Sequence, residues 1–428
     1  MNKILVRKIV TLGVIIVFCS LALTPVIGAP APSVIDLPMP ITVDMGLEGA
    51  MSRRMSIRNF TEDPVPLEEL STVLWAAYGY REDKNRTVYG MEGLHAAELY
   101  VFTNDSVFWY DAYNHSLILY KSGDYRSMIA QYEAPIQLGI VWNSSKNSDE
   151  NLSGAEIGMI GQNIQFVANA LGLGTVVTAS RPSPLDDVGL PPGEYGRIVM
   201  PLGTPLYPYM FEYKPRWVSL LPQVLCSHRN VTDVLMNFSV STSFGGCLSW
   251  QEFSQIVWSL YGYSPLLDRS DQEGNPLKRH RTVPSAHGYY PFRVYAVMAG
   301  GVYRYIPGLL PYDKFGLPIV SYLQKIRWLD HRDEVADASQ PFVSSAPLIL
   351  VIVLDIRNTN KWDDLSGEAI RWVWFYEAGA MAHNVVLAAE AWDLNANIVP
   401  VTDPGSLCDL LLLRETNYQP MLIVPLGG

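Results

Sequence analysis

The segment Leu67-Glu-Glu-Leu-Ser-Thr-Val-Leu-Trp-Ala-Ala-Tyr-Gly-Tyr80 has a counterpart later in the chain, Ser249-Trp-Gln-Glu-Phe-Ser-Gln-Ile-Val-Trp-Ser-Leu-Tyr-Gly-Tyr263. In both segments apolar residues recur every three or four positions, which is the spacing of an amphipathic helix. Both segments also end in Tyr-Gly-Tyr, and a glycine after the last apolar turn is typical of a helix end. The same helix is therefore predicted twice, which indicates an internal repeat.

Further matching elements follow each helix in the same order. They are the strands 98–102 and 293–297, the apolar runs Glu133–Val141 and Ser345–Val353, the long helices Ala155–Leu171 and Glu368–Trp392, the strands Thr175–Thr178 and Ile398–Val401, and closing strands that end in Pro-Leu-Gly. The second long helix carries Gly379 and Asn384 where the first has Gly161 and Asn163 nearby. The apolar runs are unbroken, as in strands that are covered on both faces.

This order predicts an α+β fold built from two similar domains, residues 45–217 and 224–428. Each domain is expected to be a mixed sheet flanked by helices, and the two are expected to pair within the chain as a covalent pseudo-dimer. The composition agrees, because 428 residues with 49% hydrophobic and 17% charged residues can bury a large core. The net charge of −11 argues against binding to nucleic acid or to an anionic lipid surface.

The first 28 residues predict a signal peptide for export. Lys3, Arg7 and Lys8 precede the apolar run Ile9–Leu23, and Pro25 follows it. The run is short for a membrane span. An uncleaved N-terminal anchor remains the alternative, and it would be the chain's only contact with a membrane.

Asn-x-Ser/Thr sequons also indicate export. There are eight, at Asn59, Asn85, Asn104, Asn114, Asn143, Asn151, Asn230 and Asn237. Sequons accept N-linked sugar in exported proteins. We therefore expect a secreted or cell-surface glycoprotein.

Cysteine is sparse outside the signal. Cys226, Cys247 and Cys408 are too few for a disulfide framework. We predict one bridge between Cys226 and Cys247, with Cys408 as a buried thiol.

The segment Arg53-Arg-Met-Ser-Ile-Arg-Asn-Phe60 carries the most distinctive chemistry. Three guanidinium groups and one hydroxyl within six residues suit the binding of a phosphate. The alternative is a charged, exposed helix end. Metal and Ser-His-Asp chemistry have little support, since the His-Glu-x-x-His, paired Cys-x-x-Cys and Gly-x-Ser-x-Gly motifs are all absent from the sequence.

With the elements that follow it, this segment resembles the flavin-dependent nitroreductase superfamily. In that family an Arg-x-Ser-x-Arg/Lys-x-Phe segment holds the phosphate and ribityl chain of FMN, and Gly-Leu-Gly follows the long core helix, here Gly172-Leu-Gly174. The resemblance implies flavin contacts from the first half at Arg54, Ser56, Arg58, Asn163, Thr178, Ala179, Ser180, Lys214 and Arg216. Of these, Lys214 and Arg216 would complete the phosphate clamp, and Thr178–Ser180 would pass beside the flavin ring.

The second half resembles azoline-dehydrogenase-type members of the superfamily. Those carry an Arg-x-x-Pro-Ser-Ala-Gly-x-x-x-Pro-x-x-x-Tyr block, which is similar to Arg281–Tyr295 here, whereas Arg86–Tyr100 of the first half has lost Pro-Ser-Ala. In the family, flavin sites lie between two subunits, one giving the Arg-Ser clamp and the other the Pro-Ser segment. The second half keeps Pro284, Ser285 and Gly288, but its start at Cys226–Val231 lacks the clamp. The resemblance thus implies one composite FMN site per chain.

Two functions follow as hypotheses. The first is an exported FMN-dependent oxidoreductase that transfers hydride to or from an unknown small-molecule or peptide substrate, with no catalytic residue evident beyond the flavin. The second is a secreted, glycosylated, non-catalytic binding module that uses the same fold. His95 and His287 either orient a substrate or have a structural role.

Overall fold

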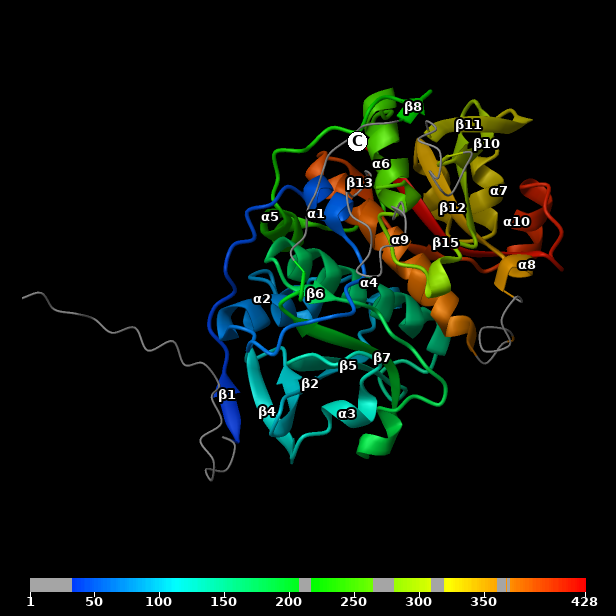
Figure 1. Cartoon of the computed structure of the whole chain (residues 1–428). Helices are drawn as coiled ribbons and strands as arrows, with labels where there is room; N and C mark the ends of the chain where they lie inside the picture. The colour runs from blue at the N-terminus through cyan, green and yellow to red at the C-terminus, as the bar shows by residue number, and fades with distance from the viewer. Residues whose placement is uncertain (1–32, 208–216, 265–280, 309–318, 360–366, 368–369) are drawn as a thin grey trace, which may run out of the picture.

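Two sheets enclose a central layer of helices in the computed structural model (Figure 1). The structure describes residues 33–207, 217–264, 281–308, 319–359, 367 and 370–428. The helices are α1 (Leu47–Arg53), α2 (Leu67–Tyr78), α3 (Arg126–Ile129), α4 (Glu150–Ala170), α5 (Val231–Asn237), α6 (Trp250–Tyr261), α7 (Arg332–Asp337), α8 (Ile356–Thr359), α9 (Arg371–Ala391) and α10 (Pro404–Leu410), with short 3-10 turns η1 (Met91–Gly93), η2 (Asp186–Val188), η3 (Ala286–Gly288) and η4 (Pro341–Ser345).

The strands divide between the two sheets by half of the chain. The first sheet has β1 (Val34–Asp36), β2 (Ala97–Phe102), β3 (Ser106–Asp111), β4 (Ser116–Ser122), β5 (Ile136–Asn143), β6 (Gly174–Thr175) and β7 (Glu194–Gly203), in the order β1-β4-β3-β2-β5-β7-β6. The second has β8 (Trp217–Ser219), β9 (Phe292–Met298), β10 (Gly301–Ile306), β11 (Ile319–Trp328), β12 (Leu348–Asp355), β13 (Asn395–Ala396), β14 (Val399–Pro400) and β15 (Tyr418–Gly427), in the order β13-β15-β12-β9-β10-β11-β8 with β14 beside β15. Described pairs are antiparallel, except that β8 and β11 are parallel.

The halves share one hydrophobic core. Buried residues of α2 and α4 from the first half and of α6 and α9 from the second join the inner faces of both sheets in a single cluster. Alternate residues of β2 and β12 point away from this cluster into smaller outer clusters, one for each sheet. The α+β class, the repeat and the pseudo-dimer are thereby confirmed.

The two long helices touch backbone to backbone where α4 crosses α9. A Cβ atom added to Gly158 would lie 1.9 Å from the carbonyl oxygen of Tyr376, and one added to Gly379 would lie 2.0 Å from that of Ala155. Gly379 therefore corresponds to Gly158. The prediction that paired Gly379 with Gly161 was wrong by one helical turn.

Reciprocal hydrogen bonds join the chain segments at the N-terminal ends of α1 and α5. Leu47 N donates to Arg229 O at 3.3 Å, and Val231 N donates to Met45 O at 2.9 Å. The two helices are therefore equivalent.

Matching contacts also place the segments that follow α1 and α5. Ile57 N bonds Thr175 O just as Ser241 N bonds Ala396 O. The counterpart of the Arg-rich segment is therefore Phe238–Phe244, and the alignment with Cys226–Val231 was wrong, although Phe238–Phe244 also lacks arginine.

Other differences from the sequence prediction are local. The expected strand Thr175–Thr178 is the two-residue β6 followed by a bridge from Thr178 to Val199. The hairpins β3–β4 and β10–β11 were not predicted. Cys226 and Cys247 are both exposed and unbridged, so the predicted disulfide is wrong, whereas Cys408 is buried as expected.

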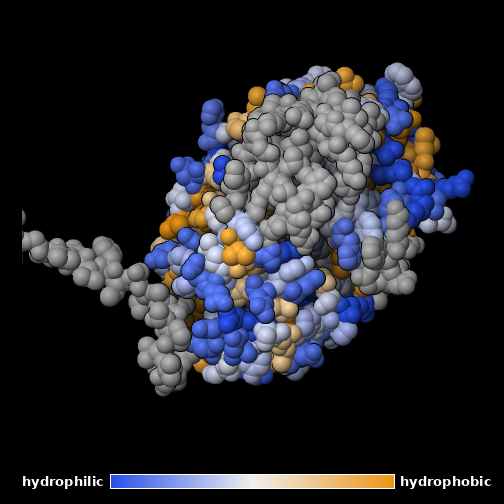
Figure 2. Space-filling model, in the orientation of Figure 1, coloured by the Kyte–Doolittle hydropathy of each residue, from blue (hydrophilic) through white to orange (hydrophobic). Residues whose placement is uncertain are grey.

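The predicted signal peptide lies outside the described residues. Among the helices that the structure describes, none is both long and apolar enough to cross a membrane. Hydrophilic residues cover much of the first half on the face drawn in Figure 2.

We expect Gly379→Ala to lower the free energy of unfolding by about 1–3 kcal/mol, because its Cβ would collide with backbone that cannot rotate away. Urea unfolding measures the change. Gly246→Ala is the matched control, since a Cβ there meets nothing within 4 Å, and it should change stability by less than about 0.5 kcal/mol. Equal effects of the two substitutions would contradict a close helix crossing.

Candidate functional site

Arg54 joins the two halves of the molecule. It ends α1 and is only 1% exposed. Its Nε donates to the carbonyl oxygen of Arg281 at 3.1 Å, and its Nη1 donates to Gln165 Oε1 on α4 at 3.2 Å. The structure therefore brings the Arg-rich segment of the first half against the segment of the second half that leads to Pro284, Ser285 and Gly288.

The other members of the Arg-rich segment lie nearer the surface. Ser56 is partly buried, and Arg58 is exposed. The Arg58 guanidinium donates to the Tyr132 hydroxyl at 3.2 Å and lies 5.8 Å from the centre of that ring. Lys214 and Arg216, the predicted remainder of the phosphate clamp, lie outside the described residues.

The residues predicted to lie beside the flavin ring, Thr178–Ser180, differ in their contacts. Both the amide and the hydroxyl of Thr178 donate to Val199 O, at 3.0 and 2.6 Å. Ala179 and Ser180 are exposed. In this segment Ala179 and Ser180 therefore reach the surface, whereas the Thr178 side chain is engaged with the backbone.

Asn163 lies in the seam between the halves. It is fully buried, its Nδ2 donates to Ala76 O at 2.9 Å and to Thr87 O at 3.0 Å, and its Oδ1 lies 2.9 Å from His383 Nε2. Burial lowers the pKa of His383 to about 3, so this ring is neutral. Asn163 has both of its donors engaged and leaves none for a flavin.

The second-half segment is held by an aromatic stack. Arg281 donates from Nη1 to Tyr261 O at 2.9 Å, and its guanidinium lies 4.1 Å from the ring centre of Tyr261 and 4.4 Å from that of Tyr263. The turn η3 follows, with Gly288 at φ +70° and open space where its Cβ would be. Any other residue at Gly288 would have to adopt this left-handed conformation.

The mirror-image position is filled with protein. Phe238 stands where the first half has Arg54, and its ring lies 4.7 Å from the Arg81 guanidinium. Gly90 stands where the second half has Ser285, and a Cβ there would lie 2.9 Å from the His95 ring. His95 in turn lies 2.9 Å from Glu156 Oε1, which is a structural contact. The mirror-image position therefore lacks the arginine and the serine, and a side chain at Gly90 would collide with His95.

Buried polar atoms without a partner gather around Arg54 and Arg281. Among the described residues no hydrogen-bond partner is found for Gln165 Nε2, Arg281 Nε, the Tyr376 hydroxyl or Glu377 Oε2. Leaving such groups unpaired costs about 1–3 kcal/mol each, so they call for an explanation. Gln165 Nε2, Arg281 Nε and the Tyr376 hydroxyl are donors, which fit the oxygens of a polar, anionic cofactor such as FMN, whereas Glu377 Oε2 is an acceptor.

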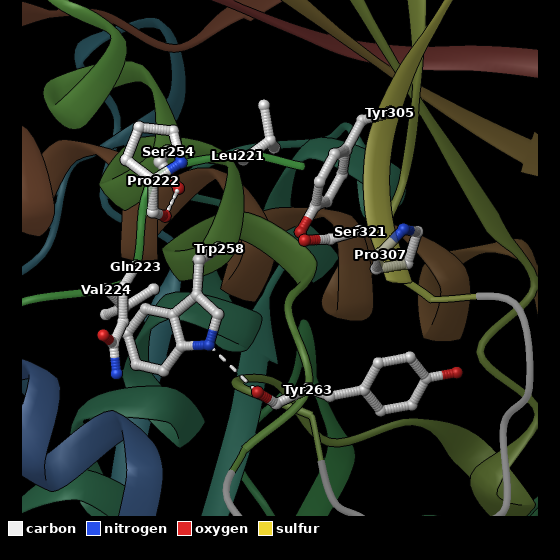
Figure 3. Close-up of a pocket in the computed structure, with 10 residues that line it drawn as sticks. All are labelled: Leu221, Pro222, Gln223, Val224, Ser254, Trp258, Tyr263, Tyr305, Pro307 and Ser321. Atoms are coloured by element: carbon white, nitrogen blue, oxygen red, sulfur yellow. Dashed lines mark hydrogen bonds between the residues drawn. The ribbon is translucent and has the colours of Figure 1, made fainter. Parts of the chain in front are cut away.

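A small pocket of about 40 Å³ lies beside α6 in the second half (Figure 3). Ten residues line it: Leu221, Pro222, Gln223, Val224, Ser254, Trp258, Tyr263, Tyr305, Pro307 and Ser321. The Tyr263 hydroxyl accepts from Arg281 Nη2 at 3.2 Å, so Arg281 connects this pocket with the Arg54 contact. The sequence places Tyr263 at the end of a predicted helix, and its position in the repeated Tyr-Gly-Tyr gives no signal of a pocket.

Comparison with known proteins identifies the family. The family model of nitroreductases matches residues 51–185 and 249–428, one match in each half. The chain belongs to the nitroreductase family. The resemblance inferred from the sequence is thus confirmed, including its tandem form, and an oxidoreductase activity is the family's common property.

Individual nitroreductases are similar to this chain over different lengths. A putative nitroreductase of Methanocaldococcus jannaschii is 29% identical over 190 residues, or 39% of this chain and 96% of that protein. The structure of a putative nitroreductase from Anabaena variabilis matches 91% of this chain and 93% of its own, with 14% identity and a TM-score of 0.62, which shows a shared fold. An FMN-dependent nitroreductase from Clostridium difficile matches 37% of this chain and 88% of its own (17% identity, TM-score 0.28).

Proposed function

We propose that this nitroreductase-family protein is an exported FMN-dependent oxidoreductase with one composite flavin site per chain. The observation that carries the proposal is the contact of Arg54 with Arg281 across the two halves, surrounded by buried polar atoms that lack partners. Members of the family are generally flavin-dependent. Their sites are built from the same two kinds of segment that meet here.

Each segment would have its own part in holding FMN. Arg58 and Ser56, together with Lys214 and Arg216, would hold the phosphate, since guanidinium groups pair with phosphate in a fixed geometry. Pro284, Ser285 and Gly288 of the second half would line the opposite side. Bound FMN would supply the hydride transfer, and the protein would position it and exclude water.

The substrate is proposed to be a small molecule or a peptide. The pocket lined by Trp258, Tyr263 and Tyr305 measures only about 40 Å³, well below the roughly 300–1,000 Å³ of ligand pockets, so it does not identify the substrate. Electrons outside the cell would not come readily from nicotinamide cofactors. An oxidase or dehydrogenase reaction, or a donor in the membrane, therefore suits an exported enzyme better than nitro-group reduction by those cofactors.

A second candidate is a non-catalytic binding module. The observation that favours it is that Arg54 already donates to two protein acceptors and is fully buried. In that case the Arg-rich segment would serve only to join the halves. Flavin binding decides between the two candidates.

Arg58→Ala should weaken FMN binding about 10- to 100-fold, because it removes a charge-assisted hydrogen bond to phosphate. Arg58 is exposed, so the chain should fold normally. Fluorescence titration with FMN measures the dissociation constant. Arg332→Ala, which removes an arginine paired with Asp330 in the other half, is the matched control and should leave it unchanged. Unchanged binding in Arg58→Ala would favour the second candidate.

Export predicts N-linked sugar on the chain. The side chains of five sequon residues are exposed, those of Asn59, Asn85, Asn104, Asn114 and Asn237. We expect the protein isolated from its own source to lose mass on treatment with a peptide N-glycosidase. Asn104→Gln should remove one glycan's mass from the total. An intact mass equal to that of the bare chain starting at Met1 would contradict both glycosylation and cleavage of a signal peptide.

A further inference from the structure

The outer faces of the two sheets carry clusters of opposite charge at equivalent positions. Strand pairing fixes the equivalence, because each residue of one cluster has the same strand neighbours as its counterpart in the other half. The matched positions, first half and then second, are Glu98 and Arg293, Tyr100 and Tyr295, Trp109 and Arg304, Asn143 and Asp355, and Glu194 and Tyr418. The repeat therefore allows the two clusters to be compared residue by residue.

The cluster of the first half is satisfied by its own partners. Glu98 accepts from Trp109 Nε1 at 3.0 Å and from Asn143 Nδ2 at 3.1 Å. Lys146 Nζ lies 2.5 Å from Glu98 Oε1 and gives it a counter-charge. Glu194 Oε1 accepts from Asn143 Nδ2 at 3.4 Å. Both carboxylates therefore have donors within the same half.

In the second half one carboxylate is shared by two arginines. Arg357 donates to Asp355 from Nε at 2.9 Å and from Nη2 at 2.7 Å, and Arg293 Nη2 lies 3.1 Å from Asp355 Oδ2. The guanidinium groups of Arg293 and Arg357 also lie 4.4 and 4.7 Å from the ring centre of Tyr418. Burial acts to raise the pKa of Asp355, but the hydrogen bonds and charges of the two arginines outweigh it and lower that pKa. Asp355 is therefore charged at pH 7 and offsets one arginine.

Arg304 adds a third guanidinium group to this cluster. It lies directly opposite Tyr295, and Arg293 is two residues from Tyr295 on β9, so the two arginines are diagonal neighbours on one face of the sheet. Arg304 Nε is buried, and among the described residues no hydrogen bond or ion pair is found for this guanidinium group. Burial, and after it the charge of Arg293, lower the pKa of Arg304. An arginine nevertheless keeps its proton in proteins, so Arg304 is a cation without a counter-charge among these residues.

The charges of the cluster indicate which kind of ligand it suits. Three arginines against one aspartate leave a formal surplus of two positive charges in the described cluster, although the whole chain has a net charge of −11. A phosphate group carries a charge of about −1.5 to −2 at pH 7 and presents several oxygens to guanidinium groups. A carboxylate would offset only one of the two charges.

We propose that the outer face of the second sheet holds a binding site for a phosphate group, formed by Arg293, Arg304 and Arg357. A free phosphate ion and the phosphate group of a larger molecule would meet the same three side chains. Tyr295 points into the outer cluster of this sheet and not into the core that the halves share, so the site lies away from the seam. The inference therefore does not depend on the proposed function.

Calorimetric titration of the full chain with inorganic phosphate, at about pH 8 and constant ionic strength, tests the site, since phosphate is then mostly a dianion. The Arg58→Ala background is used throughout, because the proposed flavin clamp would also attract phosphate. We expect saturable binding that Arg304→Gln weakens about 10- to 100-fold, because it removes a charged donor. Arg332→Gln is the matched control, since Arg332 is paired with Asp330, and it should leave the affinity unchanged.

Unfolding in urea gives a second readout, without flavin. Arg304→Gln removes a charge beside Arg293, so without phosphate it should fold at least as stably as the unchanged chain. Phosphate at ten times its dissociation constant should raise the folding equilibrium constant of the unchanged chain about tenfold more than that of Arg304→Gln. The general salt effect of phosphate acts on both chains alike. Equal stabilisation of both chains, or no saturable phosphate binding by the unchanged chain, would overturn the proposal.

The two sources of the phosphate group are distinguished by comparing inorganic phosphate with phenyl phosphate. Tighter binding of phenyl phosphate, weakened in Arg304→Gln, would assign the site to the phosphate group of a larger molecule. Equal or weaker binding of phenyl phosphate would assign it to the free ion. Affinities that Arg304→Gln leaves unchanged for both compounds would overturn the site itself.

Discussion

The arrangement of this molecule depends on the contact of two backbones at Gly158 and Gly379. No side chain fits between α4 and α9 there, so the helices approach to the limit that their main chains allow. The approach permits reciprocal bonds across the seam, from Gln162 to Asn384 and between His383 and Asn163. Across the same seam between the halves, Arg54 donates to the carbonyl oxygen of Arg281. The proposed site therefore lies where the two halves meet.

The two halves have diverged around one fold. Where the first half has Arg54 the second has Phe238, and where the second has Ser285 the first has Gly90. In a dimer of identical chains a substitution changes both sites together. Fusion into one chain removes that constraint. The two sites are then built from different segments of the chain, and each segment can change without the other. One position could thus close with aromatic and histidine side chains while the other kept unpaired polar groups.

The sequence predicted the repeat because its strongest signals are local. Helix ends, apolar strands and the turn at Gly288 are each fixed by neighbouring residues. The register of the helix crossing was misjudged because Gly158 and Gly161 lie one turn apart, and only the contact with α9 distinguishes them. The counterpart of the Arg-rich segment was missed because Phe238–Phe244 shares only its last phenylalanine with it.

The stoichiometry of flavin binding tests the central claim most directly. Titration of the full chain with FMN, followed by visible absorbance and by heat, gives the number of sites independently of any substrate. A composite site between unlike halves predicts one equivalent of FMN per chain. Two equivalents would contradict the closure of the mirror-image position, and none, in a chain shown to be folded, would contradict the flavin site itself.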